Sequence, residues 1–267
     1  MTEPEKMPFT SHLEELRSRL VKSAIAVGIC FLVCYYFVEK IFDVLTLPLM
    51  RVMEPGNHLI YTNLPEAFFT YLKAAFIASL ILASPVILYQ FWMFVAPGLY
   101  DREKRLALPI VLLSSFFFIG GALFGYFIVF PFGFKFFLGF ASDIIQPMPS
   151  MKEYLNFSSK LLLAFGLIFE LPLVLTFLTR LGIVSVDTLK RFRKYAILLS
   201  FVVAAILTPP DVMTQIMMAI PLVILYEVSI VGARLFGRKP EGAEDRSEDQ
   251  GEEEEDEDET QPNGSGA

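Results

Sequence analysis

The feature that most constrains this chain is a series of long apolar runs. Six segments are rich in hydrophobic residues. They lie at about residues 20–37, 68–96, 106–132, 161–181, 195–207 and 212–235. Runs of about 20 apolar residues match the thickness of a bilayer, and a soluble domain of this length does not contain them repeatedly. Backbone groups in lipid must be satisfied internally, and the runs do not alternate in polarity as barrel strands do. The sequence therefore predicts an all-α integral membrane protein with six transmembrane helices.

The distribution of Lys and Arg predicts the orientation of these helices. With six spans, the N-terminus, the second and fourth connections and the C-terminal tail share one side of the membrane. That side carries 16 of the 22 Lys and Arg residues. The positive-inside rule then places both termini in the cytoplasm. No small-residue cleavage site follows the first run, so we expect that span to be retained rather than removed as a signal peptide.

The net charge of −7 combines two regions of opposite sign. The segment 241–267 has 13 acidic residues and one basic residue, whereas the other 240 residues have 21 basic and 16 acidic ones. Such an acidic segment cannot bury a core. We therefore expect a cytoplasmic amphipathic helix at 1–19, a six-helix membrane domain at 20–240 and a disordered acidic cytoplasmic tail at 241–267.

The segment before the first span has the pattern of an amphipathic helix. Leucines recur on one face, and Ser11 with Glu14 three residues later forms a predicted capping box. Glu15 and Arg19 stand four residues apart, the spacing of a helical ion pair. On this evidence alone, the pair is an ordinary surface interaction.

A second acidic residue is predicted on the same membrane face. Glu103 lies in the short connection between the second and third runs, so six spans place it with Glu15 on the cytoplasmic side. Two carboxylates on a basic face could accept bidentate hydrogen bonds from paired arginines of a ligand. The alternative is that its basic neighbours in the connection, such as Arg105, neutralise Glu103.

Glu170 is the acidic residue deepest in a predicted span. It lies ten residues from both Lys160 and Arg180, about 15 Å along a helix from either charged end. A charge at that depth is unfavourable by roughly 2.5–3.5 kcal/mol on insertion scales, so Glu170 must face protein or water, or be protonated. Pro172 removes a helix hydrogen bond and predicts a kink nearby. A proton relay and a satisfied interior carboxyl both remain possible interpretations.

The fifth run is short and joined tightly to the sixth. About 13 apolar residues give a helix near 20 Å long, less than the roughly 30 Å of the hydrocarbon core. Asp211 is placed to cap the following helix, and Gln215 is a polar amide of the kind that holds membrane helices together. This predicts an asymmetric body with one shallow side.

Other residue patterns argue against catalysis. Cys30 and Cys34 have no zinc or redox spacing and are expected to pack, as are Gly120, Gly121 and Gly125. No nucleophile–base pair, metal-ligand cluster or phosphate loop can be assembled. We therefore expect no enzymatic activity, no cofactor, no metal and no nucleic-acid partner.

Several motifs together resemble the TatC family, the largest membrane subunit of the twin-arginine protein translocase. The match runs over about residues 8–235. It rests on Ser-His-Leu-Glu-Glu-Leu-Arg-Ser-Arg-Leu at 11–20, Ser-Pro-Val-Ile-Leu-Tyr-Gln-Phe-Trp at 84–92, Phe-Val-Ala-Pro-Gly-Leu-Tyr at 94–100, Glu-Lys-Arg at 103–105, Phe-Glu-Leu-Pro at 169–172 and Leu-Thr-Pro-Pro-Asp-Val at 207–212.

The resemblance implies a receptor for folded precursor proteins whose signal peptides carry paired arginines. Glu15 rather than Glu14 matches the family glutamate that contacts these arginines, together with Glu103. The expected signal-peptide-binding residues are Glu15, Glu103, Arg17, Arg19, Phe94 and Arg105. Pro48, Glu170 and Asp211 are the implied functional positions within the membrane and on its outer side.

The resemblance also implies partners and an energy source. Thr208 and Gln215 would dock the single-span subunits TatA and TatB in an oligomeric complex of the cell inner membrane. Transport would use the proton motive force, and tilted helices would form a glove-like concave bundle in the lipid bilayer. The alternative is a proton-coupled secondary transporter with Glu170 as relay, which requires further ionisable residues at mid-depth.

Overall fold

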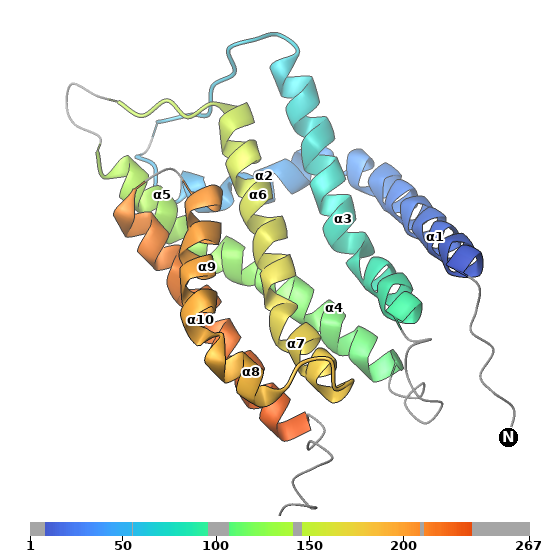
Figure 1. Ribbon diagram of the computed structural model, residues 1–267. Helices are drawn as coiled ribbons and strands as arrows, with labels where there is room; N and C mark the ends of the chain where they lie inside the picture. Colours follow the sequence, from blue (N-terminus) through green and yellow to red (C-terminus); the bar gives the residue numbers. More distant parts are fainter. Residues whose placement is uncertain (1–8, 55, 96–106, 141–145, 209–210, 237–267) are drawn as a thin grey trace, which may run out of the picture.

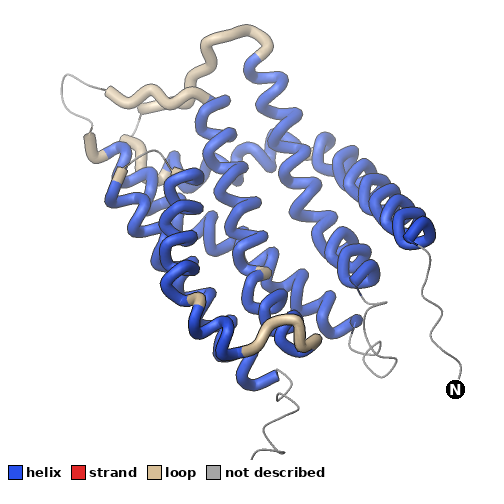
Figure 2. Tube along the Cα trace, viewed as in Figure 1, coloured by secondary structure: helices blue, strands red, loops and turns tan. Residues whose placement is uncertain are grey.

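The structure is a computed structural model that describes residues 9–54, 56–95, 107–140, 146–208 and 211–236. Within these ranges every regular element is a helix, apart from an isolated bridge between Ile60 and Ser150 (Figures 1 and 2). The predicted all-α class is therefore confirmed.

Loops at both ends of the bundle join successive helices (Figure 2). Their bounds are α1 Phe9–Tyr36, α2 Val38–Met50, α3 Glu66–Val95, α4 Ala107–Phe124, the π-helix η3 Gly125–Val129, α5 Phe130–Leu138, α6 Met151–Phe169, α7 Leu171–Arg180, α8 Val186–Arg191, α9 Arg193–Leu207 and α10 Val212–Phe236.

Within the described residues, five helical stretches are long and apolar enough to cross a membrane. They are Leu13–Tyr36, Glu66–Val95, Leu108–Leu138, Met151–Arg180 and Val212–Phe236. The expected fifth span corresponds to α9, which has only 15 residues. At about 1.5 Å per residue it is roughly 22 Å long, so its length alone does not identify it as a span.

The first helix differs from the expectation at its N-terminal end. The predicted amphipathic helix and the first apolar run form one uninterrupted helix, α1. Since α1 includes Phe9, Ser11 is inside the helix and does not cap it. The predicted capping box is therefore wrong, because the helix already begins before Ser11 rather than at it.

Two of the long stretches are interrupted at defined points. In Leu108–Leu138 the π-helix η3 separates α4 from α5, and in Met151–Arg180 the helix breaks at Glu170. Pro172 lies in the first turn of α7, where its missing N–H breaks no intrahelical bond. The kink predicted from Pro172 is confirmed.

The long helices lie side by side with their ends gathered at two levels (Figure 1). The start of α1, the end of α3, the start of α4, helix α8 and the end of α10 all lie toward the lower end of the view. Helix α2 runs crosswise behind α3 and α6 near the upper end. The short α9 runs alongside α10 and packs against it.

The interior is filled by both aromatic and aliphatic side chains. Phe130, Phe165 and Met218 are almost completely buried in the largest core cluster. Gly121 allows α4 and α6 to approach, because a Cβ there would lie 2.4 Å from the Phe165 carbonyl oxygen. Gly125 makes ordinary contacts with Phe165, whereas Gly120 faces open space and is not the packing position predicted.

Candidate functional site

The first turns of α1 carry the predicted pair of Glu15 and Arg19. The Nε atom of Arg19 lies 3.0 Å from Oε1 of Glu15, and Nη2 of the same guanidinium contacts that oxygen too. Both side chains are partly buried, at 27% and 18% exposure for Glu15 and Arg19. The helical spacing of four residues therefore brings a guanidinium onto this carboxylate, as the sequence predicted.

Other residues of the predicted signal-peptide site lie near the same end of the bundle. Arg17 is exposed and lines a shallow depression of about 380 Å³ with Glu14, Ser18 and others. Phe94 is the next-to-last residue of α3, which packs antiparallel against α1 (Figure 1). Glu103 and Arg105 lie outside the described residues.

Glu170 lies in the interior between three helices. It occupies the break between α6 and α7 and is only 7% exposed. The Ser114 hydroxyl of α4 donates to Oε2 of Glu170 at 2.6 Å, and the Trp92 indole of α3 donates to Ser114 at 3.0 Å. This chain of hydrogen bonds fixes one carboxylate oxygen, while Oε1 has no hydrogen-bond partner in the described part of the protein.

The surroundings of Glu170 favour a held carboxyl group over a relay. Ser114 and Trp92 do not titrate in the physiological range, and the Trp92 ring packs edge-on against Phe177 at 4.8 Å between centroids. Such a setting orients a polar group in an apolar interior, which costs less than burying it without partners. The sequence singled out Glu170 by its depth but gave no sign of Ser114 or Trp92.

The turn between α9 and α10 is held by three polar residues. Asp211 caps α10, with the Thr214 N–H 2.9 Å from Oδ1 and the Thr214 hydroxyl donating to Oδ2. Gln215 donates from Nε2 to the Phe201 carbonyl of α9 at 3.0 Å, and Thr208 is buried and bonds the Ala204 carbonyl. The predicted cap and the predicted interhelical amide are both confirmed.

Hydrogen bonds from the side chain and backbone of Thr214 lower the pKa of Asp211. A carboxyl group with a lowered native pKa stabilises the fold at pH values above the ordinary aspartate value of about 3.9. This contribution is lost as the pH falls through the lowered native pKa. The cap of α10 is therefore charged at neutral pH, as the positive end of a helix dipole favours.

Pro48 is buried inside α2, where a proline leaves one carbonyl without its helical donor. That carbonyl belongs to Val44, four residues earlier. The Tyr126 hydroxyl from η3 donates to the Val44 oxygen, and the Tyr154 hydroxyl from α6 donates to the neighbouring Leu45 oxygen. The proline thus opens an acceptor through which α2 is attached to the bundle.

Sequence reasoning missed Glu66, the first residue of α3. Its side chain is buried and accepts from the Thr62 N–H at 2.8 Å, the Thr62 hydroxyl at 3.0 Å and the Asn63 N–H at 3.3 Å. The Ser150 hydroxyl, at 2.6 Å, and the Lys152 N–H, at 3.3 Å, donate to its other oxygen. An acidic residue after Pro65 signals a helix start, but only the fold reveals a partner 84 residues away.

Within the described ranges, no cluster of three or more His, Cys, Asp or Glu residues is placed to hold an ion. Cys30 and Cys34 are free thiols one turn apart on α1. The polar groups described above bind helices and loops to one another.

Five long apolar helices and buried polar links between them define a multi-pass helical membrane protein. Comparison with known proteins narrows this class to one family. The profile of the family described as "Sec-independent protein translocase protein (TatC)" matches residues 11–221. The chain belongs to the TatC family, whose members are named as protein translocase components rather than enzymes.

Individual relatives agree with this assignment. The chain is 64% identical to the TatC protein of Desulforapulum autotrophicum, over 92% of this chain and 91% of that protein. It is 39% identical to the TatC protein of Escherichia coli strain K12, over 92% and 95% of the two chains. A crystal structure of a twin arginine translocase receptor, TatC, superimposes with a TM-score of 0.76 at 44% identity, covering 85% of this chain and all of that one.

Proposed function

We propose that this protein is the receptor of a twin-arginine translocase. In this proposal it binds the paired arginines of signal peptides on folded precursor proteins and nucleates the export complex. Glu15 and Glu103 receive the two guanidinium groups, with Arg17, Arg19, Phe94 and Arg105 around them. Transport is driven by the proton motive force.

The observation that carries the proposal is the contact between Glu15 and Arg19. Glu15 already accepts two nitrogens of a guanidinium group in a partly buried position at the end of α1. Arginine is the residue best suited to bind a carboxylate in this way. In the proposed mechanism an arginine of the signal peptide replaces Arg19, so the internal pair is the resting state of the site.

The proposed topology has six crossings, with α9 as the fifth and both termini in the cytoplasm. Two features support it: the ends of α1, α3 and α10 that lie at one level of the bundle, and the excess of Lys and Arg in the segments at that level. A short α9 is compatible with crossing where the bilayer is thinned. We place the protein in the cell inner membrane, with the helices around a glove-like concave face.

The proposed partners are the single-span subunits TatA and TatB, which dock on α9 and α10 near Thr208 and Gln215. The shortness of α9 leaves room beside it for a second helix. The side chains of Ile206 and Met213, which flank this turn, are exposed. A partner helix would cover this apolar surface in an oligomeric complex.

The test is crosslinking of a twin-arginine signal peptide to the membrane-inserted protein. We expect Glu15→Lys to abolish crosslinking, because it replaces the acceptor with a repelling charge. Glu14→Lys is the matched control, since Glu14 is the adjacent exposed carboxylate and does not pair with Arg19. Undiminished crosslinking in Glu15→Lys, or equal loss in both variants, would contradict the assignment.

A second variant tests the exchange of arginines. Arg19→Ala removes the internal competitor for Glu15, so the signal peptide should bind more tightly than to the parent. A signal peptide in which both arginines are lysines should not gain from this change, because lysine cannot make the bidentate contact. Equal gains for both peptides would show that Arg19 acts only through its net charge.

A further inference from the structure

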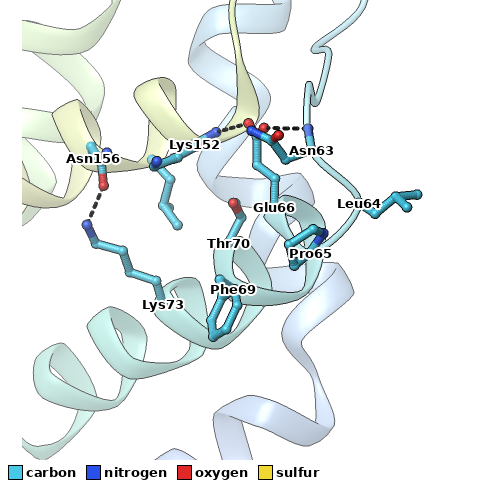
Figure 3. Close-up of a pocket in the computed structure, with 10 residues that line it drawn as sticks. Asn63, Leu64, Pro65, Glu66, Phe69, Thr70, Lys73, Lys152 and Asn156 are labelled. Atoms are coloured by element: carbon cyan, nitrogen blue, oxygen red, sulfur yellow. Dashed lines mark hydrogen bonds between the residues drawn. The ribbon is translucent and has the colours of Figure 1, made fainter.

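A largely apolar groove with a few polar groups lies at the upper end of the bundle, between the first turns of α3 and α6 (Figures 1 and 3). Its volume is about 660 Å³. Phe69 and Leu155 supply apolar lining, and Lys73, Lys152 and Asn156 supply polar groups. The groove is far along the chain from the predicted signal-peptide residues and has no role in the function proposed above.

The two lysines of this groove outnumber its one carboxylate, Glu66, so its net charge is positive. Lys73 bonds to Oδ1 of Asn156, a neutral acceptor (Figure 3). Neither Lys73 nor Lys152 forms a salt bridge with any described residue. Glu66 lines the groove as well, but its oxygens already accept five hydrogen bonds from loop and helix groups.

The hydrogen-bond direction at Asn156 adds a further donor. Because Oδ1 accepts from Lys73, the amide group of Asn156 keeps its two N–H donors for another molecule. The groove therefore presents two ammonium groups and an amide, all of which donate. An anion with several acceptor oxygens can bind all three donors at once. In a membrane, the group that offers the most such oxygens is the phosphate of a lipid headgroup.

The depth of these groups matches a lipid headgroup. Lys73 is seven residues after the first residue of α3, about 10 Å along the helix, and Lys152 is one residue after the start of α6. Lysine side chains near the ends of membrane helices extend toward the interface. The exposed Phe69 ring beside them provides a surface for an acyl chain.

We propose that this groove binds the phosphate of an anionic phospholipid through Lys73, Lys152 and Asn156, with an acyl chain against Phe69 and Leu155. Clefts between membrane helices that contain basic residues hold anionic headgroups elsewhere. The lipid phosphate gives Lys73 a charged partner at the interface, where it forms no salt bridge with any described residue. It also fills the space below the loops that Glu66 joins.

The test measures binding of phosphatidylglycerol to the purified, delipidated full chain by native mass spectrometry. Phosphatidylcholine with the same acyl chains is the reference lipid. We expect Lys73→Gln with Lys152→Gln to raise the Kd of the tightest phosphatidylglycerol site about thirtyfold. This factor corresponds to the loss of two lysine contacts with an anionic headgroup. Phosphatidylcholine binding should change little.

Matched variants separate this site from general charge. Lys40→Gln with Lys160→Gln removes two exposed lysines that do not line the groove, and should leave the tight site within about twofold. Lys73→Arg with Lys152→Arg keeps both charges and should retain binding, which also shows that the fold tolerates changes at these positions.

Three results would overturn the proposal. The first is equal affinity of the parent for phosphatidylglycerol and phosphatidylcholine, and the second is equal weakening in the two glutamine double variants. The third is displacement of the lipid by millimolar inorganic phosphate, which would identify a free-anion site. None of these results bears on signal-peptide binding, so the two proposals can fail independently.

Discussion

At the scale of single residues, several buried polar groups in the membrane part have specific partners on other helices. Glu170 is bound by Ser114, Gln215 by the Phe201 carbonyl and the Val44 carbonyl by Tyr126. In lipid these groups have no water to bond, so each partner removes a penalty and fixes a helix position.

Glu170 should tolerate an amide better than a cation. Glu170→Gln keeps an oxygen that can accept from Ser114, whereas Glu170→Lys places a second donor opposite that hydroxyl and buries a charge. We expect export of a twin-arginine precursor to persist with Gln and to be lost with Lys. Loss of export with both variants, while the protein remains inserted, would instead indicate that Glu170 titrates during transport.

Ser114→Ala is the companion variant for this site. It should lower the free energy of unfolding by about 1–3 kcal/mol, because it leaves Glu170 and Trp92 each without a partner. Ser115→Ala is the control, since Ser115 bonds only the Val111 carbonyl of its own helix. Similar thermal stabilities for the two variants in detergent would contradict this account.

Pro48 and Tyr126 should be energetically coupled. Pro48→Ala restores a backbone N–H that can donate to the Val44 carbonyl. This carbonyl then no longer depends on the Tyr126 hydroxyl for a hydrogen bond. We expect Tyr126→Phe to destabilise the parent by about 1 kcal/mol and the Pro48→Ala variant by clearly less. A double-mutant cycle of thermal unfolding in detergent measures this, and simple additivity would refute it.

At the scale of elements, the spacing of helices is set by small residues as well as by polar links. Apolar side chains give membrane helices little preference for one another over lipid, so close van der Waals packing decides which helices associate. Gly121 and Gly166 lie where α4 and α6 meet, and a Cβ on Gly166 would approach the Phe118 ring to 2.9 Å. Gly232 faces Thr176 in the same way between α10 and α7.

Gly121→Ala should separate α4 from α6. The added Cβ would lie 2.4 Å from a backbone oxygen and 2.8 Å from Phe169, so the helices must shift. We expect a loss of about 1–3 kcal/mol, read as a lower unfolding temperature in detergent. Gly120→Ala is the control, because nothing lies within 4 Å of its Cβ and alanine favours a helix. Equal stability of both variants would contradict tight packing at Gly121.

At the scale of the whole molecule, contacts with α10 make α9 part of the helical bundle. Helix α9 joins the lower α8 to the upper turn before α10 (Figure 1). Arg193 at its start pairs with Glu227 of α10 at 2.8 Å, and Gln215 of α10 donates to the Phe201 carbonyl near the middle of α9. These contacts hold α9 along α10, whatever its length.

Cysteine labelling can test the six-crossing topology. In a background with Cys30→Ala and Cys34→Ala, single cysteines replace Asn57, Ser185 or Val212. We expect an impermeant maleimide outside the cell to label the variants Asn57→Cys and Val212→Cys but not Ser185→Cys, because α9 separates the last two positions. Labelling of Ser185→Cys and Val212→Cys from the same side would show that α9 does not cross.

Much of this protein could be read from its sequence. The apolar runs gave the helical membrane class, Pro172 the break at Glu170, and Asp211 the cap of α10. Spacing of four residues predicted the pair of Glu15 and Arg19. These are local properties, in which hydrophobicity, proline chemistry and helical periodicity act within a few residues of one another.

Only the tertiary structure decided the remaining features. It brought Ser114 to Glu170, Tyr126 to the carbonyl exposed by Pro48, and Ser150 to Glu66, each pair joining different helices or loops. It also showed that Ser11 lies within α1 and that Gly121 rather than Gly120 packs. Local patterns determine which segments enter the membrane, since burial in lipid depends on each segment's own side chains. The packing of those segments depends on shape and on partners distant in sequence, so it is determined only once the helices meet.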